Sequence, residues 1–164
     1  GNAARPDPAA FAEVDRAARD LIGLARAMPA AAYTFRPAAG AVEGTRTFGE
    51  QVTHAATVVY LTAAIVLGER SPYAPGPGDN GPPALTEKDE IVDYLEGAFA
   101  YARRAIDSLA DESWLEPVQT YFGPQPRAQV AMGIAAHSYN HYGQMVVYAR
   151  LCGIVPPASR EPNA

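Results

Sequence analysis

Cysteine and lysine are almost absent from this 164-residue chain, with Cys152 and Lys88 the single examples of each. One cysteine excludes an intrachain disulfide, which fits a reducing compartment and fits a cysteine-poor exported protein equally well. The thirteen basic residues are scattered, and the net charge is −5. Because a nucleic-acid-binding protein usually carries a basic patch or stripe, we expect no nucleic-acid partner.

Long apolar runs are also missing. No unbroken run reaches the length that crosses a bilayer, so we expect no membrane insertion. The default expectation for location is the cytoplasm. The chain begins Gly1-Asn2-Ala3-Ala4, a start that either a tag scar or a removed signal peptide leaves, and the second would mean a periplasmic form.

Apolar residues recur at steps of three and four in four segments, which is the spacing of one helix face. The predicted helices span about 8–28, 48–68, 87–110 and 127–151. Each has a boundary signal in the sequence: Asp7-Pro8, the Thr47 and Glu50 capping box, Thr86 with Asp89, and Gly153 before Pro156-Pro157.

The connections 29–46, 69–85 and 112–126 are rich in proline and glycine. They contain no convincing strand pair, although Tyr121-Phe122-Gly123 fits a short extended turn. Helices with a single apolar face pack most simply as an all-α four-helix bundle. We therefore expect one domain over 1–164, with connections long enough to allow a crossover topology.

All three histidines of the chain interrupt an apolar helical stripe. His137 and His141 are one turn apart and share a face, and His54 lies on the apolar face of the second helix. Burying unbonded imidazoles costs roughly a few kcal/mol each. Convergence on a metal ion would remove that cost and leave an open coordination position. Backbone carbonyls, tyrosines or asparagines can also satisfy buried histidines, so a metal-free bundle stays open as an alternative.

Other polar residues have a structural and a functional interpretation. Glu50, one turn before His54, is either the capping-box residue or a general acid or base. Gln144 is either a polar residue at the bundle end or a partner that orients a histidine ring or a bound water. Cys152 sits at a helix C-terminus, the wrong end to activate a thiol, so packing is the better interpretation. Ser138 follows His137, which excludes the H-E-x-x-H pattern of metalloproteases.

Three segments resemble the DinB-like metalloprotein superfamily of bacterial four-helix bundles. AYTFRPAAG (32–40) resembles the tyrosine–phenylalanine–proline stretch before the second helix, and TFGEQVTHAA (47–56) the segment with the first histidine. HSYNHYGQMVVYARLCGIVPP (137–157) resembles the H-x-x-x-H helix with its closing glycine and prolines. Tyr142 stands where many members have arginine, which puts in doubt any inference that needs a cation beside the metal.

The resemblance implies an up-down-down-up bundle, often dimeric, with a divalent ion on His54, His137 and His141, usually zinc or nickel. Characterised relatives include thiol-dependent transferases and a maleylpyruvate isomerase, and some members look exported. We therefore expect a homodimeric metal-dependent enzyme of the thiol S-transferase or isomerase type that binds a small substrate and a low-molecular-weight thiol. A hydrolase is a further enzyme class that we consider. Beyond the candidates Glu50 and Gln144, the sequence identifies no catalytic residues. The alternative is a non-catalytic stress protein that binds a metal or a small ligand.

Overall fold

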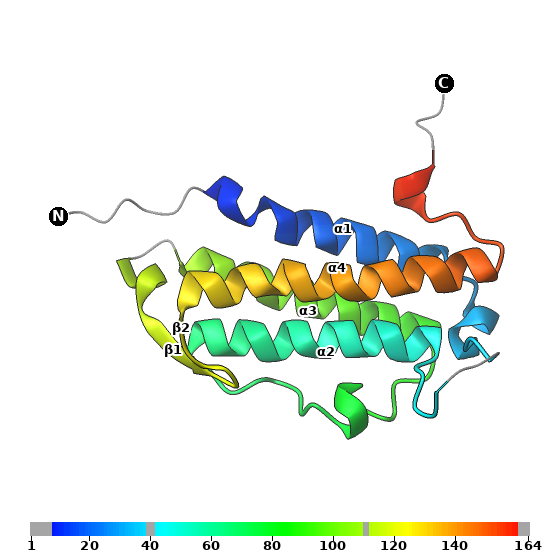
Figure 1. Ribbon diagram of the computed structural model, residues 1–164, viewed down its shortest axis with the longest axis horizontal. Helices are drawn as coiled ribbons and strands as arrows, with labels where there is room; N and C mark the ends of the chain where they lie inside the picture. The colour runs from blue at the N-terminus through cyan, green and yellow to red at the C-terminus, as the bar shows by residue number, and fades with distance from the viewer. Residues whose placement is uncertain (1–7, 39–41, 110–111, 161–164) are drawn as a thin grey trace.

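The computed structural model describes residues 8–38, 42–109 and 112–160, and four helices dominate it (Figure 1). The helices are α1 (Ala12–Ala27), α2 (Phe48–Leu67), α3 (Lys88–Ser108) and α4 (Arg127–Leu151). Between and around them lie short 3₁₀ turns at Pro8–Phe11, Ala30–Thr34, Pro77–Asp79, Glu112–Leu115 and Pro157–Ser159.

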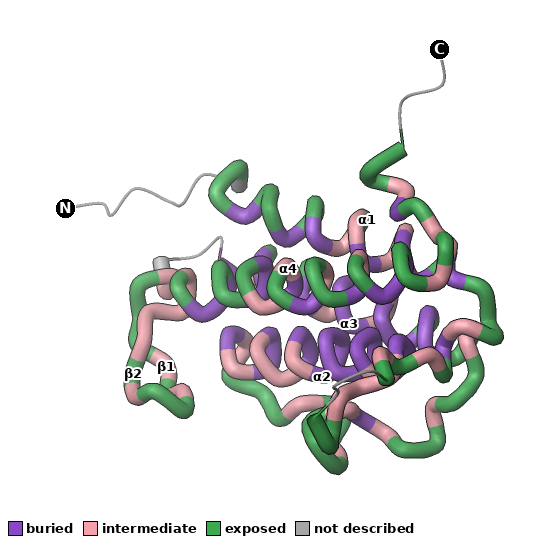
Figure 2. The backbone as a smooth tube through the Cα atoms, turned by 45° about the vertical axis from the view of Figure 1, so that its right-hand side comes forward, coloured by how far each residue is buried: buried purple, intermediate pink, exposed green. Residues whose placement is uncertain are grey.

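The chain follows the expected up-down-down-up course. In Figure 1 the connection after α2 runs back along the bundle, so that α3 starts at the same end as α2 and the two helices are parallel. Helix α2 packs mainly against α3 and α4, and α1 completes the bundle by packing on α4 and α3. Figure 2 shows the buried residues where the helices face one another. The predicted all-α four-helix bundle is confirmed.

The ends of α2 and α4 follow from their boundary residues. Thr47 Oγ1 accepts the Glu50 N–H at 3.1 Å, and the Glu50 carboxylate accepts the Thr47 N–H at 2.8 Å, which is the predicted capping box. At the end of α4, Gly153 has φ +77° and donates to Arg150 O, and the next N–H donates to Ala149 O. This is a Schellman motif, in which glycine takes the left-handed conformation at no steric cost.

The starts of α1 and α3 differ from the sequence expectation. The 3₁₀ turn at Pro8–Phe11 precedes α1, and Asp7 lies outside the described residues. The cap expected at Thr86 is wrong, because the extended N-cap position is occupied by Glu87 and has no side-chain hydrogen bond. Thr86 is one residue too early, and its hydroxyl donates to the Glu87 carboxylate instead.

A β-hairpin lies in the connection for which no strand pair was expected. Strand β1 (Pro117–Thr120) pairs antiparallel with β2 (Gly123–Pro126), and Tyr121-Phe122 form the two-residue turn. The three prolines of the strands hid this pattern, yet they fall only on the pairs Pro117–Pro126 and Gln119–Pro124. In an antiparallel ladder, every second pair of residues forms no backbone hydrogen bonds. The Arg127 N–H donates to Glu116 O at 3.0 Å, so the neighbouring pairs with proline are the ones without hydrogen bonds and need no N–H.

Helix α2 is the most buried helix of the bundle. By length and composition it could cross a membrane, since its mean hydropathy is 1.2. However, 67% of this apolar stretch is buried within the bundle. The sequence expectation concerned unbroken apolar runs, whereas the average hydropathy over α2 does reach that of a membrane-spanning helix. Packing against α3 and α4 accounts for the apolar character of α2.

Candidate metal centre

The three histidines converge at one place between α2 and α4. One possible ligand atom from each ring lies within 4.8 Å of the others. The ring centroids of His54 are 5.3 Å from His137 and 4.4 Å from His141, and those two are 4.5 Å apart. His54 and His141 are buried, and His137 is partly buried. The helical spacing predicted that His137 and His141 share a face, and facing helices bring His54 to them.

A backbone carbonyl orients the His54 ring. His54 Nδ1 lies 2.9 Å from Asp79 O, and since a carbonyl only accepts, Nδ1 carries the hydrogen. The other ring nitrogen, Nε2, then presents a lone pair, which is the arrangement of a metal-ligating histidine with an outer partner. The Asp79 contact was not anticipated from the sequence.

Glycine allows the 69–85 connection to approach α2 this closely. Gly81 has φ +75°, and a Cβ there would lie 2.5 Å from Thr57 Oγ1. Tyr73 anchors the same connection, with its ring 4.8 Å from Tyr60 and 5.0 Å from Tyr94. Asp79 itself has φ +57°, a left-handed conformation that Asp tolerates better than most residues. Asp, Asn and Gly are typical turn residues, so the Asp79-Asn80-Gly81 sequence is compatible with this bend.

A pair of glutamines orients the His141 ring. His141 Nδ1 lies 2.8 Å from Gln51 Oε1, and Gln51 Nε2 donates to Gln144 Oε1 at 2.9 Å. Among the described residues, the contact of Gln144 with the histidines runs through Gln51 of α2, a residue that the sequence analysis did not single out. This chain of contacts holds His141 Nδ1 as the hydrogen donor and leaves Nε2 free to ligate.

His137 has a buried ring nitrogen without a partner. Among the described residues, none forms a hydrogen bond with His137 Nδ1. A buried polar atom without a partner destabilises the fold unless something else satisfies it. An ion shared with His54 and His141 is one group that would remove the need for a protein partner at this ring.

Burial keeps the imidazoles in the neutral form that binds metal. Desolvation, with smaller contributions from the neighbouring histidines and Arg46, lowers the pKa of His137 to about 4 and that of His141 to about 3. The pKa of His54 is also lowered, by desolvation first and then by Arg46. All three rings are thus unprotonated near pH 7, as metal ligation requires. The donor set fits a divalent ion such as zinc or nickel.

Arg46 supplies a cation near the histidines from a part of the chain that the sequence did not indicate. Its Nε donates to Asn80 Oδ1 at 2.7 Å and its Nη2 to Gly78 O at 2.9 Å. These bonds hold the turn that carries Asp79. Position 142 is tyrosine and not arginine, but Arg46 provides positive charge near the centre.

An open cavity of about 700 Å³ reaches the centre, and both His54 and His137 line it. Four residues of α2 beyond His54 line the same cavity and are only partly buried: Val58, Leu61, Thr62 and Ile65. A small molecule entering this cavity would meet two of the three imidazoles.

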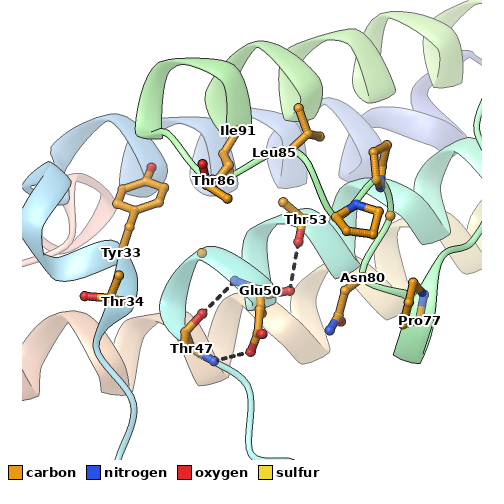
Figure 3. Close-up of a pocket in the computed structure, with 14 residues that line it drawn as sticks. Tyr33, Thr34, Thr47, Glu50, Thr53, Pro77, Asn80, Leu85, Thr86 and Ile91 are labelled. Atoms are coloured by element: carbon orange, nitrogen blue, oxygen red, sulfur yellow. Dashed lines mark hydrogen bonds between the residues drawn. The ribbon is translucent and has the colours of Figure 1, made fainter.

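Glu50 lies elsewhere. Its carboxylate accepts from Thr47 N–H and lies 3.5 Å from Arg36, and it lines a second cavity of about 350 Å³ (Figure 3). It is absent from the residues that line the histidine cavity. These contacts explain the role of Glu50 as a capping residue. A catalytic role for Glu50 stays a prediction.

Replacing Gln51 by alanine is expected to lower metal affinity about 10–100-fold, the usual cost of removing an outer partner of a ligating histidine. His141 would lose the acceptor of its Nδ1–H and with it the fixed ring orientation. Competition with a chromophoric chelator measures the affinity. Gln119→Ala, on the exposed hairpin strand, is the matched control, and an unchanged affinity in Gln51→Ala would contradict the assignment.

Comparison with known proteins supports the fold and the family. Residues 13–145 match the family model described as the DinB superfamily. A DinB-like protein from Bacillus cereus has 20% identity, 90% coverage of this chain, 93% of that chain, and a TM-score of 0.68. A candidate DinB family member from Exiguobacterium sibiricum has 21% identity, 98% and 99% coverage, and a TM-score of 0.64. No curated protein matches the chain.

Proposed function

Because the chain belongs to the DinB superfamily and its three histidines converge beside an open cavity, we propose that it is a divalent-metal-dependent enzyme of the thiol S-transferase or isomerase type. The observation that carries the proposal is the position of His54 and His137 in the cavity wall. A purely structural metal site is closed, whereas a catalytic one keeps a position open to substrate.

The proposed ion is zinc or nickel, held by His54, His137 and His141. When bound, such an ion supplies a Lewis acid that lowers the pKa of a group at its open position. In the transferase form, the thiol S–H bond breaks and a carbon–sulfur bond forms on the electrophile. The proton goes to solvent, and the leaving group departs with its electron pair. In the isomerase form, the thiolate forms a carbon–sulfur bond to one carbon of a double bond, and the π electrons move onto an adjacent electron-withdrawing group of the substrate. After rotation about the resulting single bond, those electrons return and expel the thiolate, which re-forms the double bond.

The residues of the chain itself prepare this site. Asp79 O and Gln51 Oε1 fix the tautomers of His54 and His141. The Arg46 guanidinium adds positive potential at the rings, which favours an anionic sulfur there over a neutral one. Homodimer formation stays a prediction from the family resemblance.

The second candidate function is a non-catalytic metal- or ligand-binding stress protein. One observation favours it: Asp79 is the sole carboxylate among the described residues that line the cavity, so a dedicated general base is not evident. A binding protein needs the same three histidines and the same open cavity, and it needs no proton acceptor.

Turnover with a panel of low-molecular-weight thiols and soft electrophiles distinguishes the two functions. Metal-loaded protein is expected to accelerate at least one pair, and chelation is expected to reduce the rate by about 10³-fold, because a bound ion contributes several kcal/mol. Elemental analysis of the same samples establishes loading. Fully loaded protein without turnover across the panel would favour the binding function instead.

A further inference from the structure

Apolar side chains make up much of the lining of the histidine cavity, and its polar residues Thr62, Thr120, Gln125 and Gln129 are uncharged. Its aliphatic residues are Val58, Leu61 and Ile65 of α2 and Val130 of α4. Its volume of about 700 Å³ is in the range that encloses a drug-sized molecule. Such a wall gains free energy from contact with an apolar group and offers little to a strongly hydrated one.

The charge around the cavity is unfavourable to anions away from the histidines. Among the described residues that line it, none is lysine or arginine, and Asp79 is acidic. The whole chain has a net charge of −5. A carboxylate, sulfonate or phosphate on the distal part of a ligand would therefore lose hydration without gaining a cationic partner.

The hairpin turn adds two aromatic rings at the mouth of the cavity. Tyr121 is 98% exposed and Phe122 is 91% exposed, yet both line the cavity. Adjacent aromatic side chains so exposed are often contact surfaces, since covering them removes apolar area from water. A flat apolar group lying between the hairpin and the helices would cover these rings.

We infer that the substrate of this site carries an uncharged, apolar, aromatic-sized body, which lies between the α2 and α4 wall and the Tyr121-Phe122 turn while its reactive end faces the histidines. The inference rests on the proposed function for the reactive end only. The cavity's preference for an uncharged body follows from its own lining and is measurable without metal.

Two fluorescent dyes that share one aromatic body test this preference. N-phenyl-1-naphthylamine is uncharged, and 8-anilinonaphthalene-1-sulfonate adds one sulfonate. In the chelated, metal-free protein, we expect the uncharged dye to bind at least about tenfold more tightly, because the sulfonate meets no lysine or arginine among the described residues that line the cavity. Equal affinity, or tighter binding of the sulfonate, would overturn the inference.

Gly133 offers a substitution that places a side chain in the cavity and is expected to preserve the fold. A Cβ at Gly133 or at Gly143 would meet no atom within 4 Å, and both glycines lie on the exposed side of α4. Gly133→Leu places a side chain in the cavity, whereas Gly143→Leu adds the same side chain to the same helix outside it. Both replacements raise helix propensity, so neither is expected to unfold the protein.

Gly133→Leu is expected to weaken binding of the uncharged dye at least about tenfold, and Gly143→Leu to leave it unchanged. Phe122→Ala is expected to weaken it less, with Leu115→Ala, another exposed apolar residue of the same connection, as its control. Dye binding that is indifferent to Gly133→Leu would place the dye elsewhere and overturn the inference. If the protein bound the dyes as expected but took up no metal, the result would support the cavity's preference for an uncharged body. It would at the same time refute the proposed function.

Discussion

Replacing His137 and His141 together by alanine is expected to abolish metal binding, from about one ion per chain in the wild type to background. The double variant keeps only His54 of the three converging rings. Removing two ligands should cost more than the roughly 10–100-fold that outer partners contribute. Elemental analysis after dialysis against zinc or nickel measures the loss directly.

The same substitution has a second readout in thermal stability. An ion that binds the native chain alone stabilises it by about 2.7 kcal/mol when its free concentration is 100 times its Kd. Added metal should therefore raise the melting temperature of the wild type and leave that of the double variant unchanged. Asn140→Ala, exposed on the same helix between the two histidines, should respond as the wild type does. Equal metal content in both proteins would refute the ligand assignment.

The helices were predictable because the boundary residues and the spacing of apolar residues in the sequence agree with the helices and buried faces of the structure. Helix α4 begins and ends at the predicted residues, since Pro126 precedes it and Gly153 closes it. The hairpin was not predictable, because prolines usually argue against strands and only the register reveals that they occupy pairs without N–H bonds. Glu87 displaced the expected Thr86 cap for a similar reason: backbone conformation, not residue type, decided the N-cap.

The histidine cluster was predictable from residue polarity together with helical spacing, which left a metal-free bundle open as the alternative. A histidine on an apolar helical stripe needs a partner, and three such residues on inward faces suggest a common one. The Asp79 partner of His54 was not predictable, because Asp79 lies in a connection whose course depends on tertiary contacts, and Arg46, which holds that turn, lies in another such connection. The sequence also did not indicate that part of the apolar face of α2 lines a cavity. Periodicity places Val58 and Leu61 on one face with His54, but it cannot distinguish a packed core from the wall of a cavity.

Acidification of the metal-free protein is expected to lower its free energy of unfolding most steeply between about pH 6.5 and 4. Burial lowers the pKa of His137 to about 4 and that of His141 to about 3 in the native state, and it also lowers the pKa of His54. In the unfolded chain each imidazole titrates near 6.5. Within this window the unfolded state binds more protons, so the histidines' contribution to stability is complete above pH 6.5 and is lost as the pH falls.

Urea unfolding at pH 7.5, 5.5 and 4.5 in the presence of a chelator measures this slope. Each histidine contributes at most about 1.4 kcal/mol per pH unit, and His137 contributes less because it is partly exposed to the cavity. His137→Leu serves as the comparison, because it removes one titrating ring and a buried nitrogen without a hydrogen-bond partner. The variant should be at least as stable as the wild type at pH 7.5 and should lose less stability on acidification, even though it binds metal poorly. If the two proteins lost stability in parallel, the neutral, buried state of His137 would be refuted, and with it the argument that this ring is held ready for an ion.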